Sequence, residues 1–96
     1  MYGLINRFVA HPGQRDALVA AMTSDVGALP GCRSFVVAHD PEDTDALWIT
    51  EVWDTKADWE ASLEIPRVKA SIEVALPLIR DFGEAIEREV VAVHEL

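Results

Sequence analysis

Cysteine is nearly absent from this sequence, because Cys32 is the single cysteine in 96 residues and no disulfide can form within the chain. A chain without disulfides suits a reducing compartment, so we expect a cytoplasmic location. Basic residues are also scarce: 8 Lys and Arg stand against 17 Asp and Glu, and the net charge is −9. This balance argues against binding to the phosphates of nucleic acids or to anionic membrane surfaces.

Long apolar runs and several common motifs are missing as well. No stretch approaches the roughly 18–20 apolar residues that a membrane-spanning helix needs, and the start of the chain has no basic segment typical of a signal peptide. The sequence contains no glycine-rich phosphate-binding motif and no paired-cysteine motif. Its histidines, His11, His39 and His94, do not have the short spacing of metal ligands. We therefore expect neither a bound nucleotide nor a structural metal ion.

Hydrophobic residues make up 50% of the chain, which predicts a folded protein, and the length predicts a single domain over residues 1–96. Apolar periodicity predicts strands at 2–10, 32–39, 46–53 and 87–95, and helices at 14–29 and, interrupted before Pro66, at 56–76. The order strand, helix, strand, strand, helix, strand is typical of the ferredoxin-like sandwich. We thus expect an α+β fold with an antiparallel sheet, helices on one face, and the third strand between the first and the second.

The predicted strands carry apolar side chains on both sides. In the first strand, one side offers Leu4, Asn6 and Phe8, which we expect to face the helices, and the other side offers Ile5 and Arg7. Because the helices can cover only one face, a second copy of the chain is the simplest cover for the open face. The sequence therefore predicts a homodimer that forms through the open face of the sheet.

The open face is also expected to hold a buried ion pair. Arg7 and Glu51, from adjacent strands, are assigned to it because a buried charge is costly without a partner. Ile49 and Trp53 share one side of their strand with Glu51, so we expect them to pack in the same interface. A catalytic role for Glu51 is the alternative.

Three segments of the chain resemble the antibiotic biosynthesis monooxygenase family. Leu29–Phe35 holds a Pro-Gly-Cys turn with an aromatic residue three positions after the cysteine, Trp48–Trp53 ends in Glu-x-Trp, and Pro12–Arg15 follows the first strand. The resemblance covers roughly residues 2–93 and is closest to a branch named for quinol monooxygenases. It implies a dimeric α+β barrel, in which two sheets pack face to face. It also implies a monooxygenase that uses O₂, without a cofactor, to oxidise a quinol or another electron-rich aromatic.

Several positions depart from the pattern of that family. Leu29 stands where the family commonly has Glu, Phe35 stands where it commonly has Tyr, and Ser62 stands where many members have His. Asn6 matches a strand Asn of the haem-degrading branch, but Ser62 and Ile72 occupy the places of the Trp and His of that branch. Haem oxygenase activity is therefore not expected.

Two residues are the candidates for chemistry. The resemblance and the predicted strand face place Asn6 in a pocket, where its amide would bind a substrate oxygen. The alternative for Asn6 is a structural amide bonded to a neighbouring loop, because a buried amide needs a partner. His39, at the end of the second predicted strand, is the candidate general base, and the alternative is that a histidine at a hairpin edge has no catalytic role.

The remaining candidates are side chains expected to form the walls of a pocket for a small aromatic substrate. They are Phe35, Thr50, Trp59 and Ser62. Trp59 would stack on a planar ligand or, alternatively, pack in the core. Two functions stay open at this point: a cofactor-independent monooxygenase, and a non-catalytic dimeric α+β barrel that binds a small apolar ligand.

Overall fold

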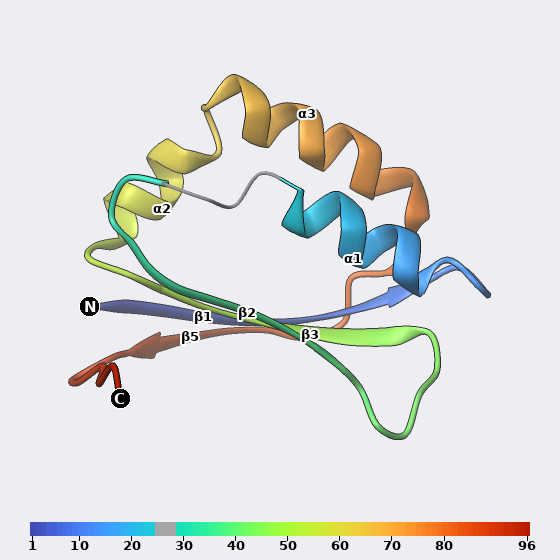
Figure 1. Cartoon of the computed structure of the whole chain (residues 1–96), viewed down its shortest axis with the longest axis horizontal. Coiled ribbons are helices and arrows are strands. Elements are labelled where there is room, and N and C mark those ends of the chain that lie inside the picture. The colour runs from blue at the N-terminus through green and yellow to red at the C-terminus, as the bar shows by residue number, and fades with distance from the viewer. Residues whose placement is uncertain (25–28) are drawn as a thin grey trace.

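The computed structural model describes residues 1–24 and 29–96. In that part of the chain, three α-helices and a short 3₁₀ helix accompany an antiparallel sheet of five strands, and the α-helices lie on one side of the sheet (Figure 1). The strands are β1 (Tyr2–Ala10), β2 (Cys32–His39), β3 (Ala46–Trp53), β4 (Ile79–Asp81) and β5 (Ala85–Glu89). The helices are α1 (Arg15–Thr23), α2 (Lys56–Ser62), α3 (Pro66–Ala75) and the 3₁₀ helix η1 (Leu76–Leu78). No described helix has the length and apolar character needed to span a membrane.

The order of the strands confirms the predicted topology. Along the sheet the order is β2, β3, β1, β4, and β5 also pairs with β1. The third strand therefore lies between the first and the second, as the crossover rule requires. The ferredoxin-like α+β fold predicted from the sequence is confirmed.

The first helix and the last strand differ from their predicted ranges. The helix predicted at 14–29 ends at Thr23, and its predicted apolar position Val26 lies outside the described residues. The strand predicted at 87–95 overlaps only β5, which begins earlier and ends at Glu89, and the short strand β4 before it was not predicted. Glu89 pairs with Tyr2, the first residue of β1, so the residues after it have almost no partner strand left.

Local sequence signals fix the helices above the sheet. The Thr55 side chain accepts a hydrogen bond from the backbone N–H of Asp58 (3.1 Å) and so caps α2, and Pro66 occupies the first turn of α3. Gly31 has φ +80°, and a Cβ at this position would lie 2.5 Å from the Asp58 carboxylate. Glycine at this turn therefore lets α2 lie close against the start of β2.

Strand register decides which side chains face the helices. Leu4 of β1 lies opposite Glu51 of β3, and Asn6 lies opposite Ile49. Because directly opposed residues share a face, Ile49, Glu51 and Trp53 point towards the helices. Trp53 is 1% exposed there. The prediction that these three residues belong to the open face is wrong, since both sides of β3 are apolar and the alternation alone does not say which side the helices cover.

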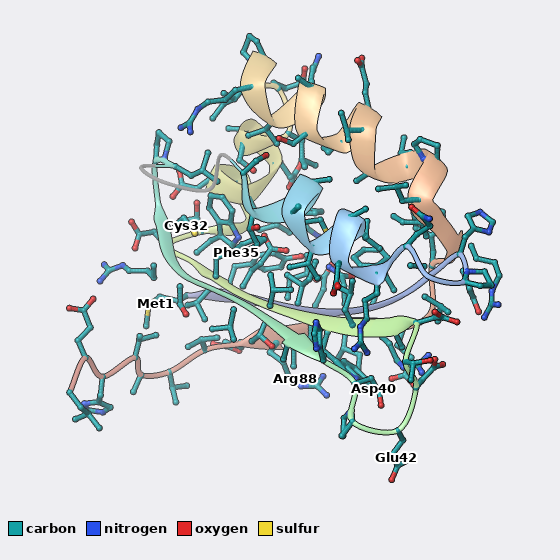
Figure 2. All side chains as sticks on the ribbon, turned by 45° about the vertical axis from the view of Figure 1, so that its right-hand side comes forward. Met1, Cys32, Phe35, Asp40, Glu42 and Arg88 are labelled. Carbon is teal, nitrogen blue, oxygen red and sulfur yellow. The ribbon has the colours of Figure 1, made fainter. Side chains whose placement is uncertain are left out.

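The open face holds a different ion pair from the predicted one. Arg7 lies there, but its Nε is 3.2 Å from Asp40 Oδ2 and its Nη2 is 3.4 Å from Asp43 Oδ2. The Trp48 indole N–H donates to the same Asp40 oxygen (3.0 Å). Figure 2 shows Asp40 on the side of the sheet away from the helices. The predicted Arg7–Glu51 pair is therefore wrong, because the two side chains lie on opposite faces.

Candidate functional site

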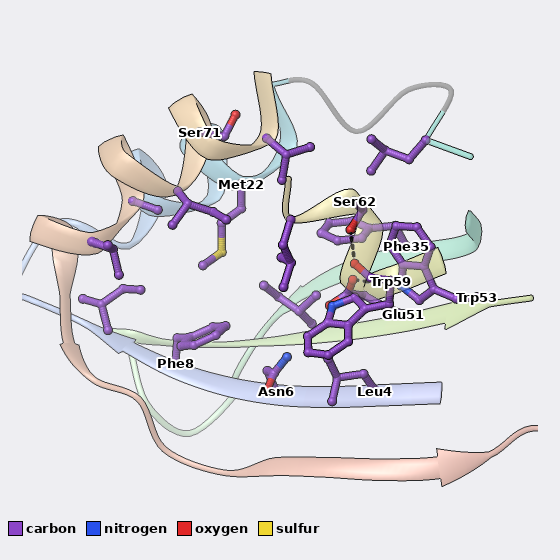
Figure 3. A pocket seen from close by; sticks show the side chains of 18 of the residues that line it. Leu4, Asn6, Phe8, Met22, Phe35, Glu51, Trp53, Trp59, Ser62 and Ser71 are labelled. Carbon is purple, nitrogen blue, oxygen red and sulfur yellow. Dashed lines mark hydrogen bonds between the residues drawn. The ribbon is translucent and has the colours of Figure 1, made fainter. Parts of the chain in front are cut away.

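A cavity of about 260 Å³ lies between the sheet and the helices. Its floor comes from β1 and β3, and α2 and α3 supply much of its roof (Figure 3). Most of its lining is apolar. The described lining residues include Leu4, Phe8, Met22, Phe35, Ile49, Trp53, Trp59, Val68, Ile72 and Phe82. Such a cavity suits a flat hydrophobic ligand.

Two polar side chains rise from the floor of this cavity, Asn6 on β1 and Glu51 on β3. Asn6 lies opposite Ile49, so Glu51 is its diagonal neighbour on the same face of the sheet. Within the described part of the chain, the Asn6 amide makes no hydrogen bond. An amide without a protein partner in an apolar cavity is available to a ligand.

Glu51 is the one ionisable side chain among the described residues that line the cavity. It is 8% exposed, and one of its oxygens accepts a hydrogen bond from the Trp53 indole N–H (3.1 Å). Burial raises the pKa of Glu51 above its ordinary value of 4.5, and the Trp53 hydrogen bond lowers it by a smaller amount. No Lys or Arg is among those lining residues, so the carboxylate has no counter-cation in the cavity.

Three of the four predicted wall residues do line the cavity: Phe35, Trp59 and Ser62. Trp59 also packs on Tyr2, with ring centroids 5.6 Å apart. The Ser62 hydroxyl donates to the Trp59 backbone carbonyl (2.5 Å) within α2, so its proton is already engaged. Ser62 therefore shapes the wall, while Phe35 and Trp59 supply aromatic surface.

The other two predicted site residues lie elsewhere. Thr50 is exposed on the open face, because it pairs with Ile5 and with Val36, so its prediction as a wall residue is wrong. His39 does not line the cavity either; its half-exposed imidazole lies 3.9 Å from Asp16. The structure thus brings Asn6 together with Phe35, Trp59 and Ser62, and it leaves the predicted general base outside.

Glu51 is the functional candidate that the sequence interpretation placed on the wrong face. The register of the hairpin formed by β2 and β3 decides which side of β3 faces the cavity. In the structure Phe35 pairs with Glu51, whereas counting back from a turn at 40–45 would pair Phe35 with Thr50, one residue out of register. A wall role for Phe35 therefore requires Glu51 to face the same cavity.

Metal-binding side chains do not cluster in the described residues. In that part of the chain, no group of three or more His, Cys, Asp or Glu side chains is placed to hold a metal ion.

Comparisons with known proteins agree on one family. A sequence model of the antibiotic biosynthesis monooxygenase family matches residues 1–74. A crystal structure from Chloroflexus aurantiacus, of a protein provisionally named an antibiotic biosynthesis monooxygenase, is 48% identical. The match covers 98% of this chain and 96% of that one, with a TM-score of 0.94. No curated protein matches the chain.

More distant structures share the fold. A protein from Nitrosomonas europaea with the same provisional name is 16% identical, with a TM-score of 0.83, and the match covers 96% of this chain and 100% of that one. A third, from Deinococcus radiodurans, is 19% identical with a TM-score of 0.79, and the match covers 100% and 98% of the two chains. At these identities the likeness extends to the architecture alone.

Proposed function

The chain belongs to the antibiotic biosynthesis monooxygenase family, and from this premise we propose that it oxidises a quinol or another electron-rich phenolic aromatic with O₂, without a cofactor. The observation that carries the proposal is the apolar cavity, on whose floor the Asn6 amide has no hydrogen bond within the described residues. A flat ring would pack against Phe35 and Trp59, and its oxygen would meet the only polar groups that the described floor presents.

The size of the cavity narrows the substrate. An apolar protein cavity of about 150 Å³ binds benzene, and this cavity measures about 260 Å³. We therefore expect a substrate with one or two fused rings.

The reaction needs little machinery beyond this enclosure. An electron-rich phenolate gives an electron to O₂ directly; one oxygen atom then enters the substrate, and the other leaves as water with two hydrogens from the substrate. The Asn6 N–H groups would stabilise the ring oxygen as it becomes negative, and the aromatic walls would exclude water.

A homodimer through the open face is part of the proposal, as is a cytoplasmic location. Apolar side chains from four strands share the open face, among them Ile5, Val36, Val52 and Ile86. Val36 is 52% exposed. A second copy would cover this surface, because one isolated chain leaves its apolar side chains in water.

Oxygen uptake tests the proposed reaction. The purified protein is mixed with a panel of one-ring and two-ring hydroquinones, and uptake is followed with an oxygen electrode. We expect uptake proportional to protein, with isotope-labelled O₂ leaving one labelled atom in the product. Quenching of tryptophan fluorescence by the same compounds measures binding separately. Binding without uptake would favour the non-catalytic binding module, and the absence of both would contradict the proposed function.

A further inference from the structure

We propose that Glu51 is the proton acceptor of the cavity: its carboxylate takes the hydroxyl proton of a neutral phenolic ligand whose oxygen is held by Asn6. This inference rests on the proposed function and narrows it. The substrate must carry a free ring hydroxyl, because a methylated oxygen has no proton to give. Glu51 would then be a catalytic residue in place of His39, which lies outside the cavity.

The position of Glu51 fits this role. Glu51 and Asn6 are diagonal neighbours on adjacent strands, a separation across which two side chains can meet at one ligand atom. Figure 3 shows Asn6 rising from β1 and Glu51 beside Trp53 and Trp59 among the side chains that line the cavity. A phenol hydroxyl placed there would donate to Glu51 and accept from the Asn6 amide.

The carboxyl group is held in place and still has bonding capacity. Trp53, itself 1% exposed, donates its indole N–H to Oε1 of Glu51. Within the described part of the chain this is the only hydrogen bond of the Glu51 side chain. A carboxylate has about four acceptor sites, so a ligand hydroxyl has a place to bind.

A purely structural role does not account for a carboxyl group at this position. A glutamine would accept the same Trp53 hydrogen bond without the cost of burying an uncompensated charge. The titratable groups near Glu51 are Tyr2 on β1 and Cys32 on β2, and neither is a cation. Burial is the main cause that raises the pKa of each. The charge of Glu87, and less strongly that of Glu51, raises the pKa of Tyr2 further, and the charge of Glu51 raises that of Cys32, so both stay neutral. The helices facing Glu51 contribute Trp59 and Ser62, which carry no charge.

The proton transfer is balanced. The phenol O–H bond breaks, an O–H bond forms on the Glu51 carboxylate, and the negative charge moves to the phenolate oxygen beside Asn6. Burial raises the pKa of Glu51 towards that of a phenol, near 10, which makes the transfer less uphill than it would be to an exposed carboxylate. The phenolate then reduces O₂, and the proton on Glu51 is available to the oxygen atom that leaves as water.

The test compares Glu51→Gln with the unmodified protein, using oxygen uptake with hydroquinones. General base catalysis contributes roughly 100-fold to 10,000-fold, so we expect kcat/KM to fall by about 100-fold or more at neutral pH. The fall should shrink for more acidic phenols and at alkaline pH, where the ligand ionises without a base. In the unmodified protein kcat/KM should rise with pH as Glu51 ionises, and this rise should vanish in Glu51→Gln. Replacing a residue with a purely structural role would not change how kcat/KM depends on the acidity of the phenol.

Two further variants keep the outcome decisive. Glu60→Gln makes the same chemical change at an exposed position on α2 and should leave kcat/KM unchanged. Glu51→Asp keeps a carboxylate and should retain the rise with pH at a lower rate.

If Glu51→Gln folds and keeps both its kcat/KM and its pH rise, Glu51 is not the base, although the proposed function stands. If both Glu51 variants fail to fold, Glu51 is structural and the proposal is overturned. An unmodified protein without any uptake would instead contradict the proposed function itself.

Discussion

Two tryptophans on β3 make the same kind of hydrogen bond on opposite faces of the sheet, in opposite electrostatic settings. On the open face, Trp48 donates to Asp40 (3.0 Å), and Arg7 also binds that carboxylate. On the helix-covered face, Trp53 donates to Glu51 (3.1 Å), and the described cavity lining supplies no cation. Hydrogen bonds lower the pKa of Asp40: the backbone N–H of Glu42 contributes most, then Trp48, then Arg7. Burial instead raises the pKa of Glu51.

The comparison distinguishes polar groups whose hydrogen-bond partners come from the protein itself from polar groups that can still bind a ligand. The Arg7 guanidinium stacks over Trp48 at 5.9 Å and binds two hairpin carboxylates, so the protein itself satisfies that cluster. Within the described residues, the Asn6 amide has no hydrogen bond and the Glu51 carboxyl has one, and both side chains line the cavity. Incomplete satisfaction in an apolar enclosure is the stronger sign of function, because burying such groups costs stability unless something binds them.

The largest expected effect comes from truncating the two tryptophans in turn. Trp53→Ala removes a buried indole and should lower the free energy of unfolding by about 3–5 kcal/mol. Trp48→Ala removes a partly exposed indole and one hydrogen bond, so we expect a loss nearer 1–2 kcal/mol. Denaturant unfolding followed by circular dichroism, at constant protein concentration, measures both. Equal losses would show that Trp48 is packed as fully as Trp53 in the protein in solution, whether by its own chain or by the partner of the proposed dimer.

The next effect concerns activity on the covered face. Asn6→Ala removes a donor to a charged ligand oxygen, worth roughly 1.5–3 kcal/mol, so kcat/KM should fall about tenfold to a hundredfold. Its melting temperature should barely change, because the amide has no hydrogen bond within the described chain. Thr50→Ala, on the open face, is the control and should keep its activity. Lost stability with unchanged activity would make Asn6 a scaffold residue.

The order of the elements was readable from the sequence, but the choice of face was not. The turn at 40–45 and the strand–helix order predict the position of β3, because few topologies satisfy the crossover rule. The alternation along β3 separates Trp48 from Trp53 correctly but leaves open which of them the helices cover, since both sides are apolar. His39 and Thr50 were misplaced for related reasons: no local pattern says where α2 and α3 close over the sheet.

The open face should in turn be sensitive to charge. Val36→Glu places a carboxylate on the proposed dimer surface and should weaken association by about tenfold or more, roughly 1.4 kcal/mol. Val74→Glu on α3 is a matched control, since Val74 is 59% exposed but lies on a helix. Light scattering should return twice 10.6 kDa for the unmodified protein and for Val74→Glu, and a lower mass for Val36→Glu. A monomeric unmodified protein would contradict the proposed dimer.

The smallest expected effect is a dependence of stability on pH that arises from Glu51 alone. Its pKa is higher in the folded protein than the ordinary value of 4.5, so the folded state holds the proton more tightly than the unfolded chain. The resulting stabilisation is fully present below pH 4.5 and is lost as the pH rises through the folded-state pKa. Each whole pH unit that separates the folded pKa from the unfolded pKa corresponds to about 1.4 kcal/mol.

Glu51→Gln lacks this contribution, so its free energy of unfolding should increase relative to that of the unmodified protein as the pH rises from about 4 to 8. Asp40→Asn should show the opposite trend. The pKa of Asp40 is lowered in the folded protein, so its carboxylate stabilises the fold at pH values above the unfolded pKa, and this stabilisation is lost as the pH falls through the folded pKa. The free energy of unfolding of the unmodified protein should therefore rise relative to that of Asp40→Asn as the pH rises. Parallel curves for Glu51→Gln and the unmodified protein, from urea unfolding at each pH, would show that the buried carboxyl is as well solvated as an exposed one.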